Sequence, residues 1–261
     1  MIFLFDVDGT LTPPRRPMTE KMCATMRTLT GSSKVYLASG SDMKKIEEQV
    51  PHEILAQCGG IFPCSANQFY KGEELQYENQ FIPEESLVHQ LEKMIETSPY
   101  PLRTGNHIEY RPGMINFSIV GRDATLEQRS AYYKWDSKKQ ERKRMAVLLM
   151  ATFPELDIKI GGEISIDIYP SGYDKSQAVR YLQEQYPEEI ICFFGDRMDE
   201  HGNDYSAAQA LGERDFLFPV RNCRRTQEIL NFYLQGGKLC SINQMTNTNL
   251  KNQKKLNYAN P

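Results

Sequence analysis

The chain has 261 residues, of which 40% are hydrophobic and 25% are charged, as is usual for a globular protein. Its formal net charge of -3 gives no reason to expect nucleic acid or an anionic membrane as a partner. No apolar run approaches the roughly 18 residues that could span a bilayer, the opening apolar run lacks the basic flank of a signal peptide, and the six cysteines form no C-x-x-C pair. We therefore expect a cytoplasmic protein. The length of the chain is sufficient for a well-buried core.

Two strand–helix units are expected in residues 1–50. Residues 2–5 and 34–38 are continuous apolar runs, as expected of strands that are buried on both faces. Each is followed by a helical pattern, over residues 20–29 and 43–50. This order predicts a parallel sheet with short connections.

The middle of the chain has a different pattern. In residues 163–169 isoleucines alternate with Ser165, Asp167 and Tyr169, which predicts a strand of an antiparallel sheet with one polar face open to a cleft. The other elements expected here are helices over 84–97 and 130–153 and strands over 106–110, 114–120 and 156–162.

After Gly172 the first pattern resumes. The expected elements are helices over 175–185, 203–210 and 224–234 and strands over 190–194 and 216–220. We predict an α/β fold in which a Rossmann-like parallel-sheet core, residues 1–80 and 172–234, is interrupted by an inserted α+β domain over 81–171 that contains an antiparallel sheet. The polar, basic segment 235–261 is expected to be disordered.

Asp6 and Asp8 directly follow the first strand, at the edge of an open α/β sheet where ligands bind. Gly9 lets the chain turn, so the two carboxylates can point in different directions. One carboxylate could then be a nucleophile toward phosphorus, and the other a general acid and base. A D-x-D sequence by itself is more often a turn, but the apolar run before it and the G-T-L-T after it favour catalysis.

Further polar residues follow the ends of other expected elements. Ser39 and Ser41 come after the second strand, where hydroxyl and N–H groups can hold a phosphate. Lys175 begins a helix and could neutralise phosphate oxygens. Asp196 follows the strand 190–194, and together with Asp6 it offers the oxygen ligands that Mg²⁺ prefers. Any one of these residues could be an ordinary surface residue, but their joint order favours a single site.

The chain carries four motifs that resemble those of the haloacid dehalogenase superfamily: D-V-D-G-T-L-T, S-G-S-D, G-Y-D-K and F-F-G-D-x-x-x-x-x-G-N-D. The inserted region contains I-E-Y-R-P-G-M-I-N-F-S-I-V-G-R and I-G-G-E-I-S-I-D-I-Y-P. With these segments, residues 2–234 resemble the eukaryotic-type phosphomannomutases. The resemblance implies a haloacid dehalogenase-type core with the insert as a cap domain.

The resemblance implies a role for each matching residue. Asp6 would be the nucleophile, Asp8 the general acid and base, and Lys175 the cation that neutralises the phosphate. Mg²⁺ would be held by the side chains of Asp6 and Asp196 and by the main-chain carbonyl of Asp8. Besides Ser41, the residues implied to bind substrate are Arg15, Arg111, Arg122, Arg129, Ser165 and Asp167. Arginines in the insert have a physical purpose, because a bisphosphate intermediate needs a second cationic site.

The activity implied is interconversion of mannose 6-phosphate and mannose 1-phosphate through a phosphoaspartate, supplying GDP-mannose synthesis. A hexose 1,6-bisphosphate would be both intermediate and activator, hexose phosphates would be the small-molecule partners, and a homodimer would form through the cap. Some positions depart from the family pattern: Ser39 replaces a glycine, residues 62–67 read F-P-C-S-A-N, and Pro112 replaces an asparagine. A sugar-phosphate phosphatase and a catalytically idle binding relative therefore remain alternatives, as do mannose and glucose phosphates as substrates.

Overall fold

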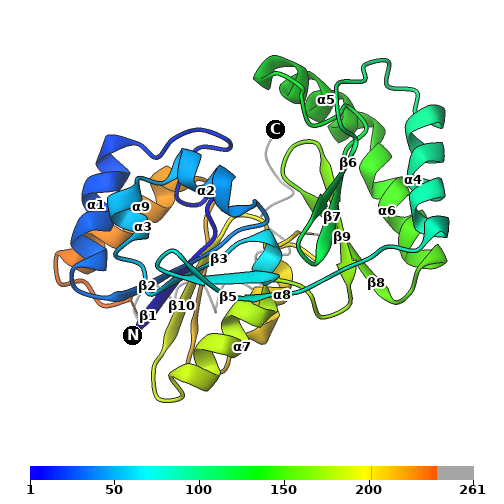
Figure 1. The fold of residues 1–261 in the computed structure, drawn as a ribbon. Coiled ribbons are helices and arrows are strands. Elements are labelled where there is room, and N and C mark those ends of the chain that lie inside the picture. The colour runs from blue at the N-terminus through cyan, green and yellow to red at the C-terminus, as the bar shows by residue number, and fades with distance from the viewer. Residues whose placement is uncertain (201, 240–261) are drawn as a thin grey trace.

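The computed structural model describes residues 1–200 and 202–239, which form two lobes, each built on its own sheet (Figure 1). The core lobe has a seven-stranded sheet in the order β11-β10-β1-β2-β3-β4-β5, and the cap lobe has a four-stranded sheet in the order β6-β7-β9-β8. All cap strands come from one continuous stretch of chain between β5 and β10. The expected boundaries at 80/81 and 171/172 fall in the connections before α4 and before α7, and the domain division stays a prediction.

The core sheet is parallel from β11 to β3 and antiparallel from β3 to β5. Its strands are β1 (Ile2–Phe5), β2 (Lys34–Ala38), β3 (Gly60–Phe62), β4 (Gln68–Lys71), β5 (Glu74–Glu78), β10 (Ile191–Gly195) and β11 (Phe216–Pro219). In the registers on either side of β1, Phe5 is paired with Phe194 and with Leu37. The strands β1, β2 and β10 therefore end at the same level, so the residues that follow them lie at one edge of the sheet.

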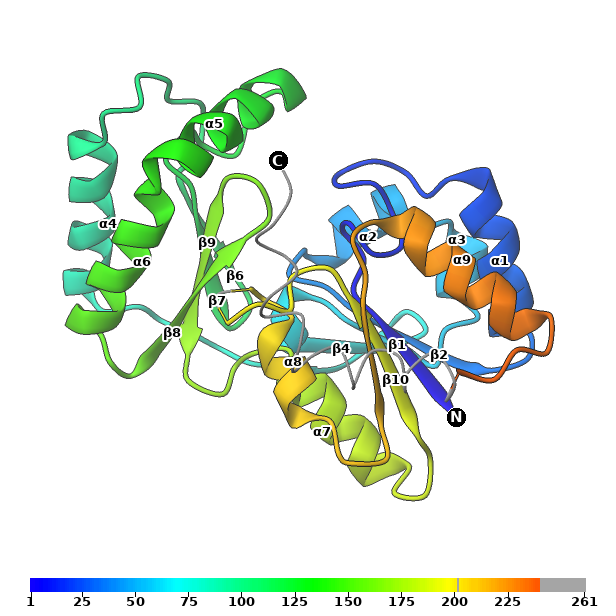
Figure 2. The ribbon, with the colours of Figure 1, turned by 180° about the vertical axis from the view of Figure 1, so that it is seen from behind.

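Helices cover both faces of the core sheet (Figure 2). Phe3 and Phe5 pack in one hydrophobic cluster with the helices of one face, while Ile2 and Leu4 pack in another with those of the opposite face. The helices are α1 (Glu20–Thr30), α2 (Met43–Gln49), α3 (His52–Leu55) and α9 (Cys223–Leu234) on the first face, and α7 (Ser176–Gln185) and α8 (Tyr205–Ala210) on the second. Burial on both faces explains why β1 has no polar residue.

The cap sheet has helices on one face only, and its other face is turned toward the core (Figure 1). Its strands are β6 (Ile108–Arg111), β7 (Met114–Phe117), β8 (Leu156–Gly161) and β9 (Ser165–Pro170), and its helices are α4 (Glu85–Thr97), α5 (Leu126–Lys139) and α6 (Glu141–Thr152). Ile166 and Ile168 of β9 belong to the cap's hydrophobic cluster, whereas Ser165 and Asp167 line the pocket between the lobes. The predicted alternation is therefore confirmed for Ser165 and Asp167, which lie on a polar face at the pocket. The expectation is wrong for Tyr169, which is buried with Cys64 and Met114 instead.

The expectation of one helix over 130–153 is wrong. The helix is interrupted at Gln140, whose φ of 55° is left-handed, so that α5 and α6 are separate. Asp136 and Arg142 stabilise this break, because the Asp136 carboxylate accepts hydrogen bonds from the main-chain N and the Nε of Arg142, at 2.9 and 2.8 Å. Residues 51–80, for which no strands are predicted, contain β3, β4 and β5.

Residues 240–261 lie outside the described residues, so the expected disorder of the segment 235–261 stays a prediction. Within residues 1–200 and 202–239, no helix combines the length and the apolar character needed to cross a membrane. The cysteines of the same part of the chain are free thiols.

Candidate active site

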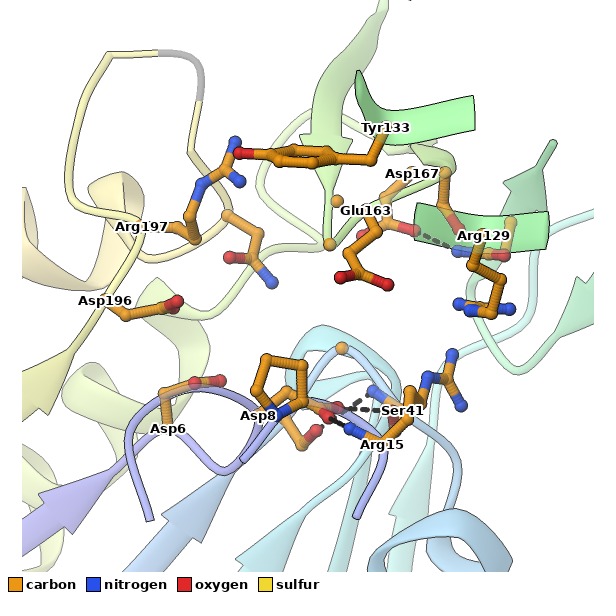
Figure 3. A pocket seen from close by; sticks show the side chains of 18 of the residues that line it. Asp6, Asp8, Arg15, Ser41, Arg129, Tyr133, Glu163, Asp167, Asp196 and Arg197 are labelled. Atoms are coloured by element: carbon orange, nitrogen blue, oxygen red, sulfur yellow. Dashed lines mark hydrogen bonds between the residues drawn. The ribbon is translucent and has the colours of Figure 1, made fainter. Parts of the chain in front are cut away.

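A pocket of about 240 Å³ lies between the carboxyl edge of the core sheet and the polar face of the cap sheet (Figure 3). The structure brings most of the predicted site residues to its wall: Asp6, Asp8, Arg15, Ser41 and Asp196 from the core, and Arg111, Arg129, Ser165 and Asp167 from the cap. Two predicted residues do not line it. Lys175 is fully buried behind Asp6, and Arg122 lies behind Ser165.

Three carboxylates form an acid cluster on the core side: Asp6, Asp196 and Asp204 each place an oxygen within 4.8 Å of the other two. The ammonium of Lys175 lies 2.5 Å from Asp6 Oδ1 and 2.6 Å from Asp204 Oδ1. Asp204 Oδ2 accepts hydrogen bonds from the main-chain N of Asp196 and Arg197, both at 3.1 Å. Asp204 therefore positions Lys175 and Asp196. This role was not predicted, although Asp204 is the last residue of the G-N-D in the fourth motif.

The acid cluster carries more negative charge than Lys175 can balance. Burial, together with the charges of Asp204 and Asp196, raises the pKa of Asp6 well above its usual value, although Lys175 opposes this. Burial and the Asp204 charge raise the pKa of Asp196 to about 7. A divalent cation would relieve this repulsion, and carboxylate oxygens are the ligands that Mg²⁺ prefers. The residues present therefore fit a Mg²⁺ site.

Asp8 points away from the acid cluster, as its partners show. Its Oδ1 accepts hydrogen bonds from the main-chain N of Arg15 and from Nε2 of Gln49, both at 2.8 Å, and its Oδ2 accepts one from Ser41 Oγ at 3.3 Å. Gly9 makes this possible with a φ of +85°, and a Cβ at that position would lie 2.3 Å from Asp196 Oδ2. Arg15 also has a left-handed φ of 59°, a strained conformation of the kind that gathers at functional sites. The metal-ligand role of the Asp8 carbonyl stays a prediction.

The segment that departs from the family pattern supports the loop after β2. Cys64, Ser65 and Ala66 all have left-handed φ values, of 51°, 57° and 66°. This turn lets the main-chain N of Cys64 donate to the carbonyl of Ser41 at 2.9 Å and that of Ser65 donate to the carbonyl of Ser39 at 2.8 Å. The Ser39 hydroxyl in turn accepts from the main-chain N of Ser41 at 3.0 Å. The unusual residues thus hold in place the loop 39–41, which lines the pocket.

An arginine cluster on the cap side is formed by Arg111, Arg122 and Arg129, whose Nε atoms are all buried. Those of Arg111 and Arg129 lack a hydrogen-bond partner, while that of Arg122 lies in an ion pair with Glu109. Burial lowers the pKa of Arg122 and of Arg129, and the neighbouring charges of Arg111 and Arg15 add to the effect. Arg122 Nη1 donates to Ser165 Oγ at 2.7 Å. Like charges held together with free donors make this cluster a site for a multivalent anion.

Glu109 of β6 joins the arginine cluster to the core. Its Oε2 lies 2.5 Å from Arg111 Nη2 and 3.0 Å from Arg122 Nε, and its Oε1 lies 2.7 Å from Nζ of Lys45 in α2. Burial alone would raise the pKa of Glu109, but Arg111, Lys45 and Arg122 outweigh it and lower the pKa to about 2. Arg111 Nη1 also donates to the carbonyl of Gly40 in the core, at 2.7 Å. The sequence analysis missed Glu109 and Lys45, because their pairing spans the two lobes.

Comparisons with known proteins agree with this geometry. Residues 22–235 match the model of the eukaryotic phosphomannomutase family. The phosphomannomutase of Dendrobium officinale is 38% identical over 213 residues, which are 78% of this chain and 83% of that protein. That of Encephalitozoon cuniculi is 36% identical over 212 residues, or 78% and 82% of the two chains.

Solved structures extend the comparison to the fold. An IMP-nucleotidase of Plasmodium falciparum has a TM-score of 0.61 at 13% identity, over 88% of this chain and 67% of that one. A haloacid dehalogenase-like hydrolase from Bacteroides thetaiotaomicron has a TM-score of 0.55 at 14% identity, over 88% and 98% of the two chains. At these identities the likeness concerns the fold alone, and it confirms the predicted haloacid dehalogenase type of core.

Proposed function

The chain belongs to the eukaryotic phosphomannomutase family, and we propose that it interconverts mannose 6-phosphate and mannose 1-phosphate through a phosphoaspartate on Asp6 and a hexose 1,6-bisphosphate. The observation that carries this proposal is the opposition of the acid cluster and the arginine cluster across one pocket. A sugar with a phosphate at each end needs one site where phosphate reacts and a second where it is only held.

In the forward direction the C1 hydroxyl of mannose 6-phosphate attacks phosphorus on Asp6. The new P–O1 bond forms as the bond to the Asp6 carboxylate breaks, and Asp8 accepts the hydroxyl proton. The bisphosphate then turns around in the pocket. Asp6 attacks the phosphate on C6, the P–O6 bond breaks, and Asp8 returns its proton to the departing oxygen. Atoms and charge balance over the cycle, and Asp6 is phosphorylated again.

The other residues hold groups in place during these steps. Lys175 balances part of the charge around Asp6 and fixes that carboxylate. Asp6 and Asp196, with the Asp8 carbonyl, would hold Mg²⁺, which when bound would supply positive charge to the transferring phosphate. Arg111, with the rest of the arginine cluster, holds the second phosphate. The cap covers the pocket, and this keeps water from hydrolysing the acyl phosphate.

Three finer points belong to the proposal. The bisphosphate acts as activator because it loads Asp6 with phosphate. The product supplies GDP-mannose synthesis in the cytoplasm, a location supported by the free thiols of the described cysteines.

The chain forms a homodimer through the cap, which is supported by Val147 and Leu148, 54% and 49% exposed on α6. Light scattering on the wild type and on Leu148→Glu tests this, since the variant should be monomeric.

A ³¹P NMR time course with mannose 1-phosphate, Mg²⁺ and catalytic hexose 1,6-bisphosphate tests the activity. We expect the mannose 1-phosphate signal to be replaced by mannose 6-phosphate, with little inorganic phosphate. Release of inorganic phosphate alone would identify a sugar-phosphate phosphatase, the alternative that Ser39 suggested. An unchanged spectrum would favour the remaining alternative, a catalytically idle binding relative. A parallel run with glucose 1-phosphate decides between the two sugars.

A further inference from the structure

Glu163 is a carboxylate in the pocket for which the mechanism above has no use. It lies in the turn between β8 and β9, is half-buried, and lines the pocket. Figure 3 shows its carboxylate pointing into the space between Asp8 of the core and Arg129 of the cap. Among the described residues, no hydrogen bond or ion pair within 4 Å reaches this carboxylate, although its charge acts on Arg129 at longer range and works against the lowering of that arginine's pKa. A carboxylate turned into a pocket without a hydrogen-bond partner can accept hydrogen bonds from a ligand.

The turn that carries Glu163 is held firmly by Arg142. Arg142 Nη1 donates to the carbonyls of Gly161, Gly162 and Ser165, at 3.3, 3.1 and 3.2 Å, on both sides of Glu163. Arg142 is itself buried and paired with Asp136 at 2.8 Å. The main chain of Glu163 is therefore fixed relative to the cap helices, and the side chain has a defined region of the pocket within reach.

The other carboxylates of the pocket wall have partners or a place in the acid cluster. Asp6 is paired with Lys175, Asp8 accepts from Gln49 and from a main-chain N, and Asp167 accepts from Asn116 at 2.5 Å. Asp196 belongs to the acid cluster. Among the carboxylates that line the pocket in the described part of the chain, only Glu163 has neither a hydrogen-bond partner nor a place in the acid cluster.

A carboxylate in this position repels phosphate and accepts hydrogen bonds, which hydroxyl groups donate. The arginine cluster attracts phosphate at one end of the pocket, and the acid cluster would do so at the other end once it holds a cation. The uncharged ring of a hexose phosphate then lies between them, within reach of Glu163. We propose that Glu163 determines specificity by accepting a hydrogen bond from one ring hydroxyl of the hexose phosphate. This inference rests on the proposed function, since it takes a hexose phosphate as the ligand.

The test combines Glu163→Gln with hexose 6-phosphates that lack one hydroxyl, at C2, C3 or C4 in turn. We expect the variant to lower kcat/KM for the complete sugar about tenfold, the size of a charge-assisted hydrogen bond. For the one analogue that lacks the contacted hydroxyl, wild type and variant should have the same kcat/KM. An equal loss on every substrate, no loss, or tighter binding of all phosphates would overturn the proposal.

Two controls separate this proposal from others. Glu155→Gln, an exposed cap residue outside the pocket, should leave every kcat/KM unchanged. The unfolding temperature of Glu163→Gln should stay close to that of the wild type, because the carboxylate has no hydrogen bond or ion pair to lose and only a longer-range attraction to Arg129. Absence of turnover in the wild type would contradict the proposed function but not the role of Glu163. In that case the affinities of wild type and Glu163→Gln for mannose 6-phosphate and its deoxy analogues, measured by calorimetry, replace kcat/KM in the comparison.

Discussion

The core side and the cap side of the pocket are built on the same principle with opposite charges. On the core side, two carboxylates of the acid cluster, those of Asp6 and Asp204, pair with one ammonium, that of Lys175, and Asp196 lies within range of its charge. On the cap side, two guanidinium groups of the arginine cluster, those of Arg111 and Arg122, pair with one carboxylate, that of Glu109, and Arg129 lies within range of its charge. In each case one group of opposite sign holds like charges together, and the remaining excess charge attracts a ligand. The core side therefore attracts a cation and the cap side an anion.

This comparison assigns different kinetic parameters to the two sides. The core side meets the atoms that react, so its residues should control kcat. The cap side holds a phosphate that does not react in the same step, so its residues should control KM more than kcat.

The largest effect is expected for Asp6→Asn. The amide has the shape of the carboxylate but cannot accept a phosphoryl group, so kcat should fall roughly 10⁴-fold or more. Binding of mannose 6-phosphate, measured by calorimetry, should persist because the arginine cluster is intact. Retention of turnover in this variant would remove the basis of the proposed chemistry.

The next effect concerns the metal site and uses a pair of glycines. In Gly9→Ala the new Cβ would lie 2.3 Å from Asp196 Oδ2, so the carboxylate must move. Activity at saturating Mg²⁺ should fall by roughly 10²-fold or more, since metal and base positions tolerate little displacement. Gly72→Ala is the control, because Gly72 has a φ of +60° but open space around it. Both variants should lose about 1 kcal/mol of stability from backbone strain, and only Gly9→Ala should lose activity.

A smaller effect, confined to the cap side, is expected for Arg129→Met. Loss of one charged donor should raise KM for mannose 6-phosphate roughly 10- to 100-fold and change kcat much less. Arg144→Met on exposed α6 surface is the matched control and should change neither. Equal losses in kcat and KM would mean that the two sides do not divide the task.

The smallest effect is expected where the two sides meet. Lys45→Met removes the ion pair between the lobes, in which the side chains of Lys45 and Glu109 are 22% and 23% exposed. It also removes the pair of Lys45 with Asp42 within α2 and its N-cap, which does not join the lobes. We expect a weaker closure of the cap and about a two- to fivefold larger share of phosphoryl transfer to water. The measurement is the ratio of inorganic phosphate to mannose 6-phosphate by ³¹P NMR. Lys44→Met, an exposed neighbour in α2, should leave the ratio as in the wild type.

The same ion pair should depend on pH in a defined direction. The pKa of Glu109 is about 2, below its ordinary 4.5, so its stabilising effect is present above pH 4.5 and is lost as the pH falls toward 2. The difference in free energy of unfolding between wild type and Lys45→Met should therefore be constant from pH 8 to about pH 5 and shrink below it. A difference that grows on acidification would contradict this assignment.

Local patterns were enough to predict much of the core and of the cap sheet. Buried strands such as β1 and β10 stand out as apolar runs, and the alternation in β9 separates its two faces. The break at Gln140 was not predictable, because glutamine carries no preference for a left-handed conformation. The strand β5, which reads E-L-Q-Y-E, has polar residues that conceal it.

The site was predictable where its residues follow strand ends in sequence order, as Asp6 and Asp196 do. It was not predictable where it depends on contacts between the lobes. The pairing of Lys45 with Glu109 joins residues 64 positions apart in sequence. The lack of a partner for Glu163 is likewise a property of the folded pocket, and no local pattern encodes it.

The position of β10 in the core sheet has a consequence for how the protein is made. This strand pairs with β1 on one side and β11 on the other, yet it is synthesised after the whole cap. While the ribosome adds residues 79–190, the emerging chain has β1 with one unpaired edge and Asp6 without Asp196. The nascent chain can therefore assemble the arginine cluster before it can bind a metal ion, and catalytic competence arises only with the last quarter of translation.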